Sequence, residues 1–168
     1  ANRARDITRP NGVYPSLLEG AGVELIQGWA QLADANTVQI DEKKHTARHI
    51  LVATGGMPFV PQFAGREHMV VSDAMFDLDP FPKRLLVVGG GYIACEFASI
   101  FNGLGAKVTQ VQRNAHLLNE FDEDVRQFLG KEMARSGVDV RLNAEISMIT
   151  RQKSGLCALL SRGQRIEA

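Results

Sequence analysis

The chain has 168 residues, 45% of them hydrophobic, a length that suits one domain or parts of two. Its 19 basic and 19 acidic side chains leave no net charge at neutral pH, which argues against nucleic acid or an anionic membrane as the main partner. No apolar run reaches the roughly 18 residues that a membrane-spanning helix needs, and no signal peptide is visible.

The N-terminal third predicts one helix followed by short strands. Apolar residues within 13–18 favour a helix that ends near Gly20. Residues 22–26 and 37–40 are expected to form strands, and the apolar run 49–53 a buried strand. Four prolines then punctuate the chain, so we expect a linker over residues 57–83.

Within the linker one short segment stands out, from Ser72 to Leu78. Ser72 and Asp73 are residue types that cap a helix N-terminus, so we expect them to begin a turn of helix.

A β-α-β pattern occupies the middle of the chain. The apolar run 85–88 is typical of a strand buried on both faces, and three glycines, 89–91, follow it. A helical pattern then ends at Gly103 and Gly105, and a second strand covers 108–111. The expected apolar face of this helix is made by Ile93, Phe97 and Ile100.

Gly89, Gly91 and Ala94 fit the G-x-G-x-x-G/A pattern of dinucleotide-binding turns. The first glycine permits a tight turn, the second lets backbone approach a diphosphate, and the small Ala94 lets helix and strand pack closely. Amides of the first helical turn lack internal partners and suit an anion. The pattern leaves NAD, NADP and FAD open, and methyltransferases use a related turn.

The end of the second strand bears on the choice of coenzyme. An NAD-binding unit usually carries an acid there, for the ribose 2′-hydroxyl, whereas this strand ends with Gln112 and Arg113. An arginine attracts a 2′-phosphate, so the sequence favours NADPH over NADH. The alternative is that Arg113 is a solvated residue at the end of a strand.

The C-terminal part predicts a helix over 122–136 with strands at 138–142, 145–150 and 156–161. Gly137 is expected to end the helix. The apolar face of that helix is expected to comprise Val125, Phe128, Leu129 and Met133. The two cysteines, Cys95 and Cys157, lack metal or C-x-x-C spacing, so we expect them to be core residues of a cytoplasmic protein.

A weak internal repeat relates the two ends of the chain. Residues 37–55 are expected to run strand, polar turn, strand and then a buried strand ending in Ala-Thr-Gly, and residues 156–168 begin the same way. In this register Ala168 corresponds to Ala47. We therefore expect the chain to begin late in one nucleotide-binding unit and to stop inside a second, since a parallel sheet without its next strand leaves an edge uncovered.

Three stretches together resemble the flavin-dependent pyridine nucleotide–disulfide oxidoreductases. They are HILVATGGMPFVPQFAG at 49–65, VVGGGYIACEFASIFNGLGAKV at 87–108, and the spacing from Arg113 to Phe121-Asp122. The run Gly-Tyr-Ile-Ala-x-Glu is typical of the glutathione reductase branch of this family.

The resemblance implies an α/β fold with a Rossmann-like βαβ NAD(P)-binding domain, truncated at both ends. It would make residues 1–56 the tail of an FAD-binding half, 57–83 a linker, and 84–168 an incomplete NAD(P)H-binding domain.

The resemblance also implies roles for matching positions. Tyr92 would shield the flavin and swing aside for nicotinamide, Ile93 would line the coenzyme site, and Glu96 would help to position the nicotinamide. Thr54 and Gly55 would lie near FAD. The alternatives are that Tyr92 is an ordinary packed aromatic residue, that Glu96 is a surface charge favoured by the helix dipole, and that Ala-Thr-Gly is a plain turn.

Arg113 would hold the 2′-phosphate, but a second arginine common in this branch is replaced by Asn119, and Glu120 follows it. An amide adds no charge, so we expect weaker NADPH selectivity and some use of NADH. His116 is a further candidate for contact with this phosphate, and the four histidines form no metal or acid–base pattern.

The implied whole protein is a homodimer that passes electrons from NADPH through FAD and a redox disulfide to glutathione disulfide. No C-x-x-x-x-C pair is present in this sequence, so we expect no turnover from this segment alone. The alternatives are a sibling such as dihydrolipoamide dehydrogenase, mercuric reductase or another flavin-linked oxidoreductase, and a non-catalytic dinucleotide-binding module.

Overall fold

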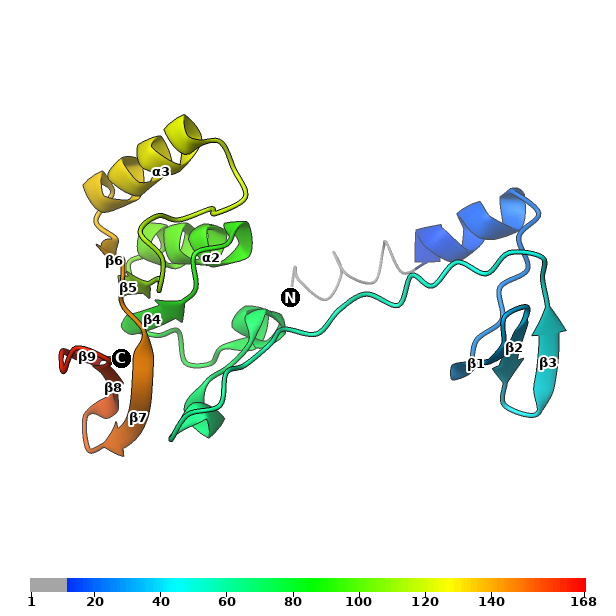
Figure 1. Cartoon of the computed structure of the whole chain (residues 1–168), viewed down its shortest axis with the longest axis horizontal. Coiled ribbons are helices and arrows are strands. Elements are labelled where there is room, and N and C mark those ends of the chain that lie inside the picture. Colours follow the sequence, from blue (N-terminus) through cyan, green and yellow to red (C-terminus); the bar gives the residue numbers. More distant parts are fainter. Residues whose placement is uncertain (1–11) are drawn as a thin grey trace. The chain divides into compact units, whose positions relative to one another are not determined.

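The computed structural model describes residues 12–168, and the chain divides into two compact units at the Gly55–Gly56 boundary (Figure 1). Each unit is described by itself. Within the described residues, no helix combines the length and apolar character that crossing a membrane requires.

The first unit contains a helix over residues 12–20 and an antiparallel sheet in the order β1-β2-β3. Its strands are β1 (Ala30–Asp34), β2 (Thr37–Ile40) and β3 (Lys43–Thr46). The turn between β1 and β2 is fixed by the Asp34 carboxylate, which accepts a 2.8 Å hydrogen bond from the Asn36 amide. The same bond is the main cause of a lowered pKa at Asp34. The helix and the strand at 37–40 are thus confirmed.

Two strands expected in this unit are absent. Residues 22–26 are irregular after a helix-ending turn in which the Val23 amide donates to the Leu18 carbonyl. Residues 49–53 are also without strand pairing, and Leu51 is 90% exposed. A strand needs a neighbour to receive its backbone hydrogen bonds, and no described strand lies beside this run. The strand expected at 22–26 and the buried strand expected at 49–53 are therefore wrong for this structure.

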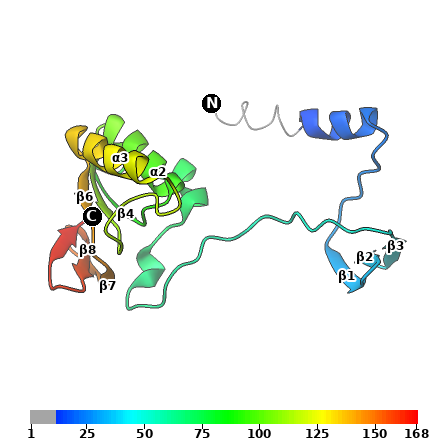
Figure 2. The same cartoon turned by 45° about the horizontal axis from the view of Figure 1, so that its top comes forward.

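The second unit is built on a parallel sheet in the order β4-β5-β6. Its strands are β4 (Arg84–Val88), β5 (Lys107–Val111) and β6 (Asp139–Arg141), and its helices are α2 (Tyr92–Gly103) and α3 (Glu123–Arg135). Both helices lie on one face of the sheet (Figure 2). The parallel α/β arrangement expected for the 84–142 region is therefore confirmed.

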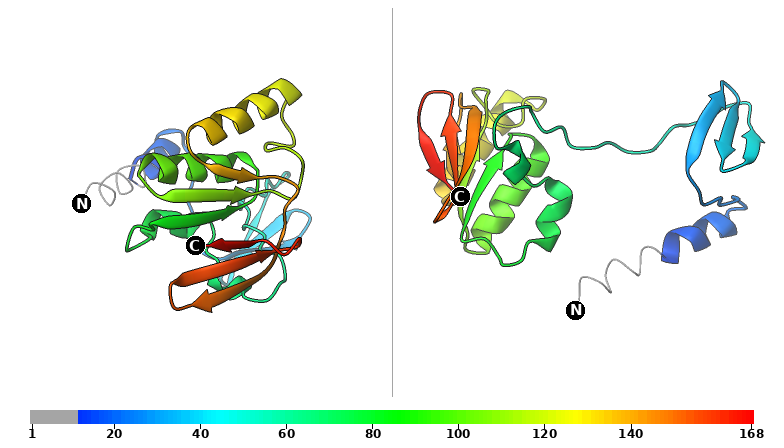
Figure 3. Two further views of the ribbon diagram at one scale, coloured as in Figure 1. Left: turned by 90° about the vertical axis from the view of Figure 1, so that its left-hand side faces the viewer. Right: turned by 90° about the horizontal axis from the view of Figure 1, so that it is seen from below.

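The opposite face of this sheet is covered by an antiparallel meander, so that helices, parallel sheet and meander form three layers (Figure 3, left). The meander consists of β7 (Ile146–Gln152), β8 (Gly155–Leu160) and β9 (Arg165–Glu167). Both β2–β3 and β8–β9 are antiparallel pairs, but their registers differ by one residue. With Ala168 matched to Ala47, Glu167 corresponds to Thr46, yet Thr46 faces Thr37 whereas Glu167 faces Cys157, which corresponds to Asn36. The strand–turn–strand part of the expected repeat is therefore confirmed, whereas its buried third strand at 49–53 is not formed.

Alternation along the central strands divides the buried side chains into two cores. On β4, Leu85 and Val87 face the helical side, whereas Leu86 packs against the meander core. On β5, Val108 belongs to the helical core and Val111 to the meander core. Cys95 lies in the first core and Cys157 is buried in the meander, as expected for small apolar side chains.

The segment that precedes β4 is attached to the second unit. It contains two short 3₁₀ turns, η1 (Arg66–His68) and η2 (Ser72–Asp77). Ahead of η1, the Ala64 carbonyl accepts a 2.8 Å hydrogen bond from the Ile149 amide of β7. The helix cap expected at Ser72 is wrong, because η2 is preceded by Val71 and has no side-chain cap.

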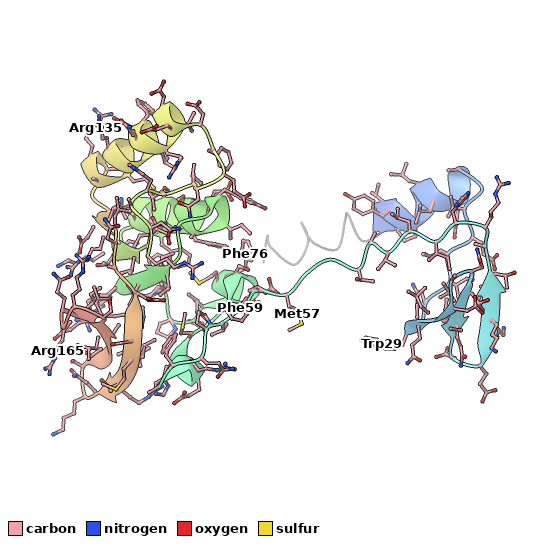
Figure 4. All side chains as sticks on the ribbon, in the orientation of Figure 1. Trp29, Met57, Phe59, Phe76, Arg135 and Arg165 are labelled. Carbon is pink, nitrogen blue, oxygen red and sulfur yellow. The ribbon has the colours of Figure 1, made fainter. Side chains whose placement is uncertain are left out.

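The apolar face expected for α2 is also wrong. The buried residues of α2 are Cys95, Ala98 and Phe101, whereas Ile93 and Ile100 are 43% and 51% exposed. Helix α2 carries more apolar residues than its contact with the sheet buries, and η2 covers only some of the others. Phe76 of η2, labelled in Figure 4, packs edge-on against Phe97 with ring centroids 5.4 Å apart.

Helix α3 begins where it was expected, with the Asp122 carboxylate accepting a hydrogen bond from the Asp124 amide as a cap. Met133 is buried in the helical core, but Val125 and Phe128 are 47% and 67% exposed, contrary to the expected apolar face. The helix packs against β6 near its C-terminal end, so its first turns lie beyond the edge of the core.

Candidate functional site

The glycine-rich turn between β4 and α2 is the centre of the candidate site. Gly89 has φ 128°, a conformation that side-chain-bearing residues rarely adopt, and its amide donates to the Val111 carbonyl of β5 at 2.8 Å. A Cβ at Gly89 would lie 3.8 Å from the Ala94 Cβ. The turn is therefore tight and close to the helix, as a dinucleotide-binding turn requires.

All three carbonyls of the turn are bound to the protein interior. The Gly89 carbonyl accepts from the Gln110 side-chain amide at 3.0 Å. The Gly90 carbonyl accepts from the Leu118 backbone amide at 2.6 Å, and the Gly91 carbonyl accepts from the Cys95 amide at 3.1 Å. With the negative ends of these peptide dipoles held inward, the turn presents its positive ends to a ligand.

The space outside the turn suits a diphosphate. A Cβ built on Gly91 meets no heavy atom within 4 Å, so the backbone is open there. Helix α2 has no side-chain cap, and its first intrahelical donor is Cys95, which leaves the amides of the preceding turn for an external acceptor. The residues present thus fit the anionic part of a dinucleotide.

Three sequence-predicted residues lie on the exposed first turns of α2. Tyr92 is 59% exposed, and Glu96 is also exposed. Ile93 and Glu96 line a groove of about 260 Å³ between α2 and η2, together with Phe76 and Phe97. The structure therefore places Tyr92, Ile93 and Glu96 beside the glycine turn, on a surface accessible to a ligand.

The loop after β5 carries the other predicted residues. Arg113 and Asn119 are exposed and His116 is half-buried, while Leu117 and Leu118 anchor the loop in the helical core. Because the Leu118 amide binds the Gly90 carbonyl, this loop lies directly against the glycine turn. The structure thus brings the expected phosphate-binding loop and the glycine turn together.

Arg126 of α3 also supports this loop, since its Nε donates to the Leu117 carbonyl at 3.3 Å. Thr54 and Gly55 belong to the first unit, where both are exposed and Gly55 has φ 74°.

Sequence reasoning missed two residues that shape the turn, Gln110 and Leu118. Gln110 stands in β5 between Thr109 and Val111, where every residue from Val108 to Val111 is buried, and a polar residue in a buried strand is the signal that could have identified it. Leu118 has φ 52°, which no pattern in the sequence indicates.

Neither cysteine is poised for chemistry. Burial is the main cause of a raised pKa at the Cys95 thiol, opposed by the Gln110 side chain, so the reactive thiolate is disfavoured. Within residues 12–168, no group of three or more His, Cys, Asp or Glu side chains is arranged to hold a metal ion.

The sequence profile of the pyridine nucleotide-disulphide oxidoreductase family matches residues 5–168. The chain belongs to this family. The resemblance predicted from the residues is confirmed, and membership implies nicotinamide and flavin cofactors.

Curated members of the pyridine nucleotide-disulphide oxidoreductase family agree with this assignment. The chain is 44% identical over 167 residues to a glutathione reductase from Burkholderia cepacia, covering 99% of this chain and 37% of that protein. It is 42% identical over 159 residues to a chloroplastic/mitochondrial glutathione reductase from Pisum sativum, covering 95% and 29% respectively. The chain thus spans about a third of the length of these relatives.

A solved structure shares the fold. It is the copper(II) complex of an HOCl-induced flavoprotein disulfide reductase from Escherichia coli, with a TM-score of 0.74 and 25% identity, covering 96% of this chain and 40% of that one.

Proposed function

We propose that this chain is the nicotinamide-coenzyme-binding part of a flavin-dependent disulfide reductase, which uses NADPH and FAD to reduce glutathione disulfide. The observation that carries the proposal is the glycine turn, whose carbonyls of Gly89, Gly90 and Gly91 are all bound inward while its outer side is open. Similarity to glutathione reductases supports the substrate.

In this proposal the two units have different tasks. Residues 1–56 belong to the flavin-binding half and residues 84–168 to the coenzyme-binding half, with 57–83 connecting them. The whole protein is a cytoplasmic homodimer. Its redox disulfide comes from outside this sequence, because Cys95 and Cys157 are buried in separate places and unpaired.

The chain's own residues bind and orient the coenzyme. The turn amides bind the diphosphate, and Arg113 attracts the 2′-phosphate, with Asn119 adding a hydrogen-bonding amide but no charge. Tyr92 and Ile93 offer apolar surface at the start of α2, and Glu96 offers a carboxylate in the adjacent groove. When bound, the nicotinamide supplies a hydride that the flavin accepts.

Assaying the full-length protein tests the proposal. NADPH consumption should depend on added glutathione disulfide, with NADH supporting a slower but measurable rate. Lipoamide, mercuric ion and no acceptor are the comparison arms, each measured with both coenzymes. Turnover with lipoamide or mercuric ion alone would assign a sibling activity, and coenzyme binding without any turnover would indicate a binding module.

A further inference from the structure

Gln110 is a fully buried polar side chain in the middle of β5. It is 0% exposed and lies on the helical side of the sheet, on the same face of the strand as Val108. An apolar side chain could fill this buried position without needing any hydrogen-bond partner. A glutamine there needs partners for its amide, and those partners reveal what it does.

The amide has a defined orientation. Its Nε2 donates to the Gly89 carbonyl at 3.0 Å and lies 3.5 Å from the Cys95 sulfur. Since the Gly89 carbonyl can only accept, the nitrogen must face it. The other end, Oε1, is buried without a hydrogen-bond partner among the described residues. Gln110 therefore loses solvation of one polar atom while fixing one carbonyl of the glycine turn.

The Gly89 carbonyl is the one carbonyl of the turn that is held by a side-chain nitrogen; the other side-chain contact is the long one from the Cys95 thiol to the Gly90 carbonyl, at 4.0 Å. The Gly90 and Gly91 carbonyls are held by the backbone amides of Leu118 and Cys95, which any residue would supply. Gln112, the next residue on the same face, packs under Gly90, where a Cβ would lie 2.5 Å from its Nε2. Its Oε1 accepts from the Arg113 amide at 2.9 Å, and among the described residues its Nε2 donates to no carbonyl of the turn.

We propose that Gln110 is a positioning residue for the coenzyme diphosphate. By holding the Gly89 carbonyl inward, it keeps the Gly89–Gly90 peptide oriented so that the following amides face the ligand. It touches no part of the coenzyme and acts through the turn. The inference rests on the proposed coenzyme-binding function of this turn.

The test compares Gln110→Leu with Thr109→Val in the full-length protein. Thr109 is the matched control, being a buried polar residue of β5 on the opposite face, bonded to Asp139 rather than to the turn. Three quantities are measured for each protein: the urea midpoint of unfolding, the dissociation constant for NADPH, and that for adenosine 2′-monophosphate, which lacks a diphosphate.

Loss of one hydrogen bond should raise the NADPH dissociation constant of Gln110→Leu about threefold to tenfold. The constant for adenosine 2′-monophosphate should stay unchanged, and the urea midpoint should stay nearly level, because removing the unpaired Gln110 Oε1 opposes the cost of leaving the Gly89 carbonyl without its donor. Thr109→Val should leave both ligand constants unchanged.

Several results would overturn the idea. Wild-type NADPH affinity in Gln110→Leu would show that the turn needs no side-chain support. Equal weakening of both ligands would indicate general damage, and a variant that no longer folds would assign the glutamine to the core itself. Absence of NADPH and NADH binding in the wild-type protein would instead refute the proposed function, and this inference with it.

Discussion

Substituting Gly91 by alanine separates coenzyme binding from folding. Gly91 has φ −74° and ψ 170°, which alanine adopts without strain, and a Cβ there meets no heavy atom within 4 Å. Replacing glycine at a compatible position stabilises a protein by about 0.4–1 kcal/mol through the unfolded chain. Alanine is a poorer helix N-cap than glycine, a loss of roughly 0.5–1 kcal/mol. The two effects nearly cancel, so the free energy of unfolding should change by less than about 0.5 kcal/mol.

The same methyl group projects into the space that we assign to the diphosphate. Displacing the ligand should cost at least one charge-assisted hydrogen bond, about 1.5–3 kcal/mol, or a tenfold or greater rise in the dissociation constant. NADPH and NADH should be affected alike, because both carry the diphosphate. The assays are urea unfolding and coenzyme titration of the full-length protein. Wild-type affinity for both coenzymes in Gly91→Ala, with normal stability, would refute the location of the diphosphate at this turn.

Three further predictions concern other parts of the second unit. Arg113→Gln should raise the dissociation constant for NADPH about tenfold while leaving that for NADH nearly unchanged. Substitution of the exposed Arg151 by glutamine is the control. Equal losses of affinity for both coenzymes would exclude a role of Arg113 in binding the 2′-phosphate. Gly65→Ala should lower the free energy of unfolding by more than about 2 kcal/mol, measured with urea, because Gly65 has φ 85° and a Cβ would overlap the Ile149 carbonyl; an unchanged midpoint would contradict this packing. Burial raises the pKa of the Cys95 thiol in the folded state, so the thiol contributes stability below its unfolded pKa, and this stability is lost as the pH rises through the folded pKa. The urea midpoint of unfolding should therefore fall at alkaline pH. A Cys95→Ala variant should show a smaller fall.

Local signals in the sequence were sufficient for much of the second unit. The strand at 85–88, the glycine turn and the helix capped by Asp122 each depend on apolar runs, glycines or capping residues that lie close together in the chain. Such features are set by backbone sterics and short-range hydrogen bonds, which a sequence displays directly.

Features that depend on distant residues were not predictable in this way. Strand β1 has mixed composition and exists because β2 pairs with it, whereas the strongly apolar run 49–53 has no described neighbour and stays irregular. The buried face of α2 depends on where η2 packs. The link between Gln110 and Gly89 joins residues 21 positions apart, so only the folded sheet reveals it.

The attachment of the connecting segment has a practical consequence for recombining this protein with its relatives. Ala64 pairs with β7, and the ring of Phe81 stacks on Phe101 of α2 at 5.4 Å. A crossover placed inside residues 64–81 would therefore split one packed element between two parents. In chimaeras joined just after Gly56, where the backbone is exposed, the connecting segment and the residues of the second unit that it packs against would come from the same parent.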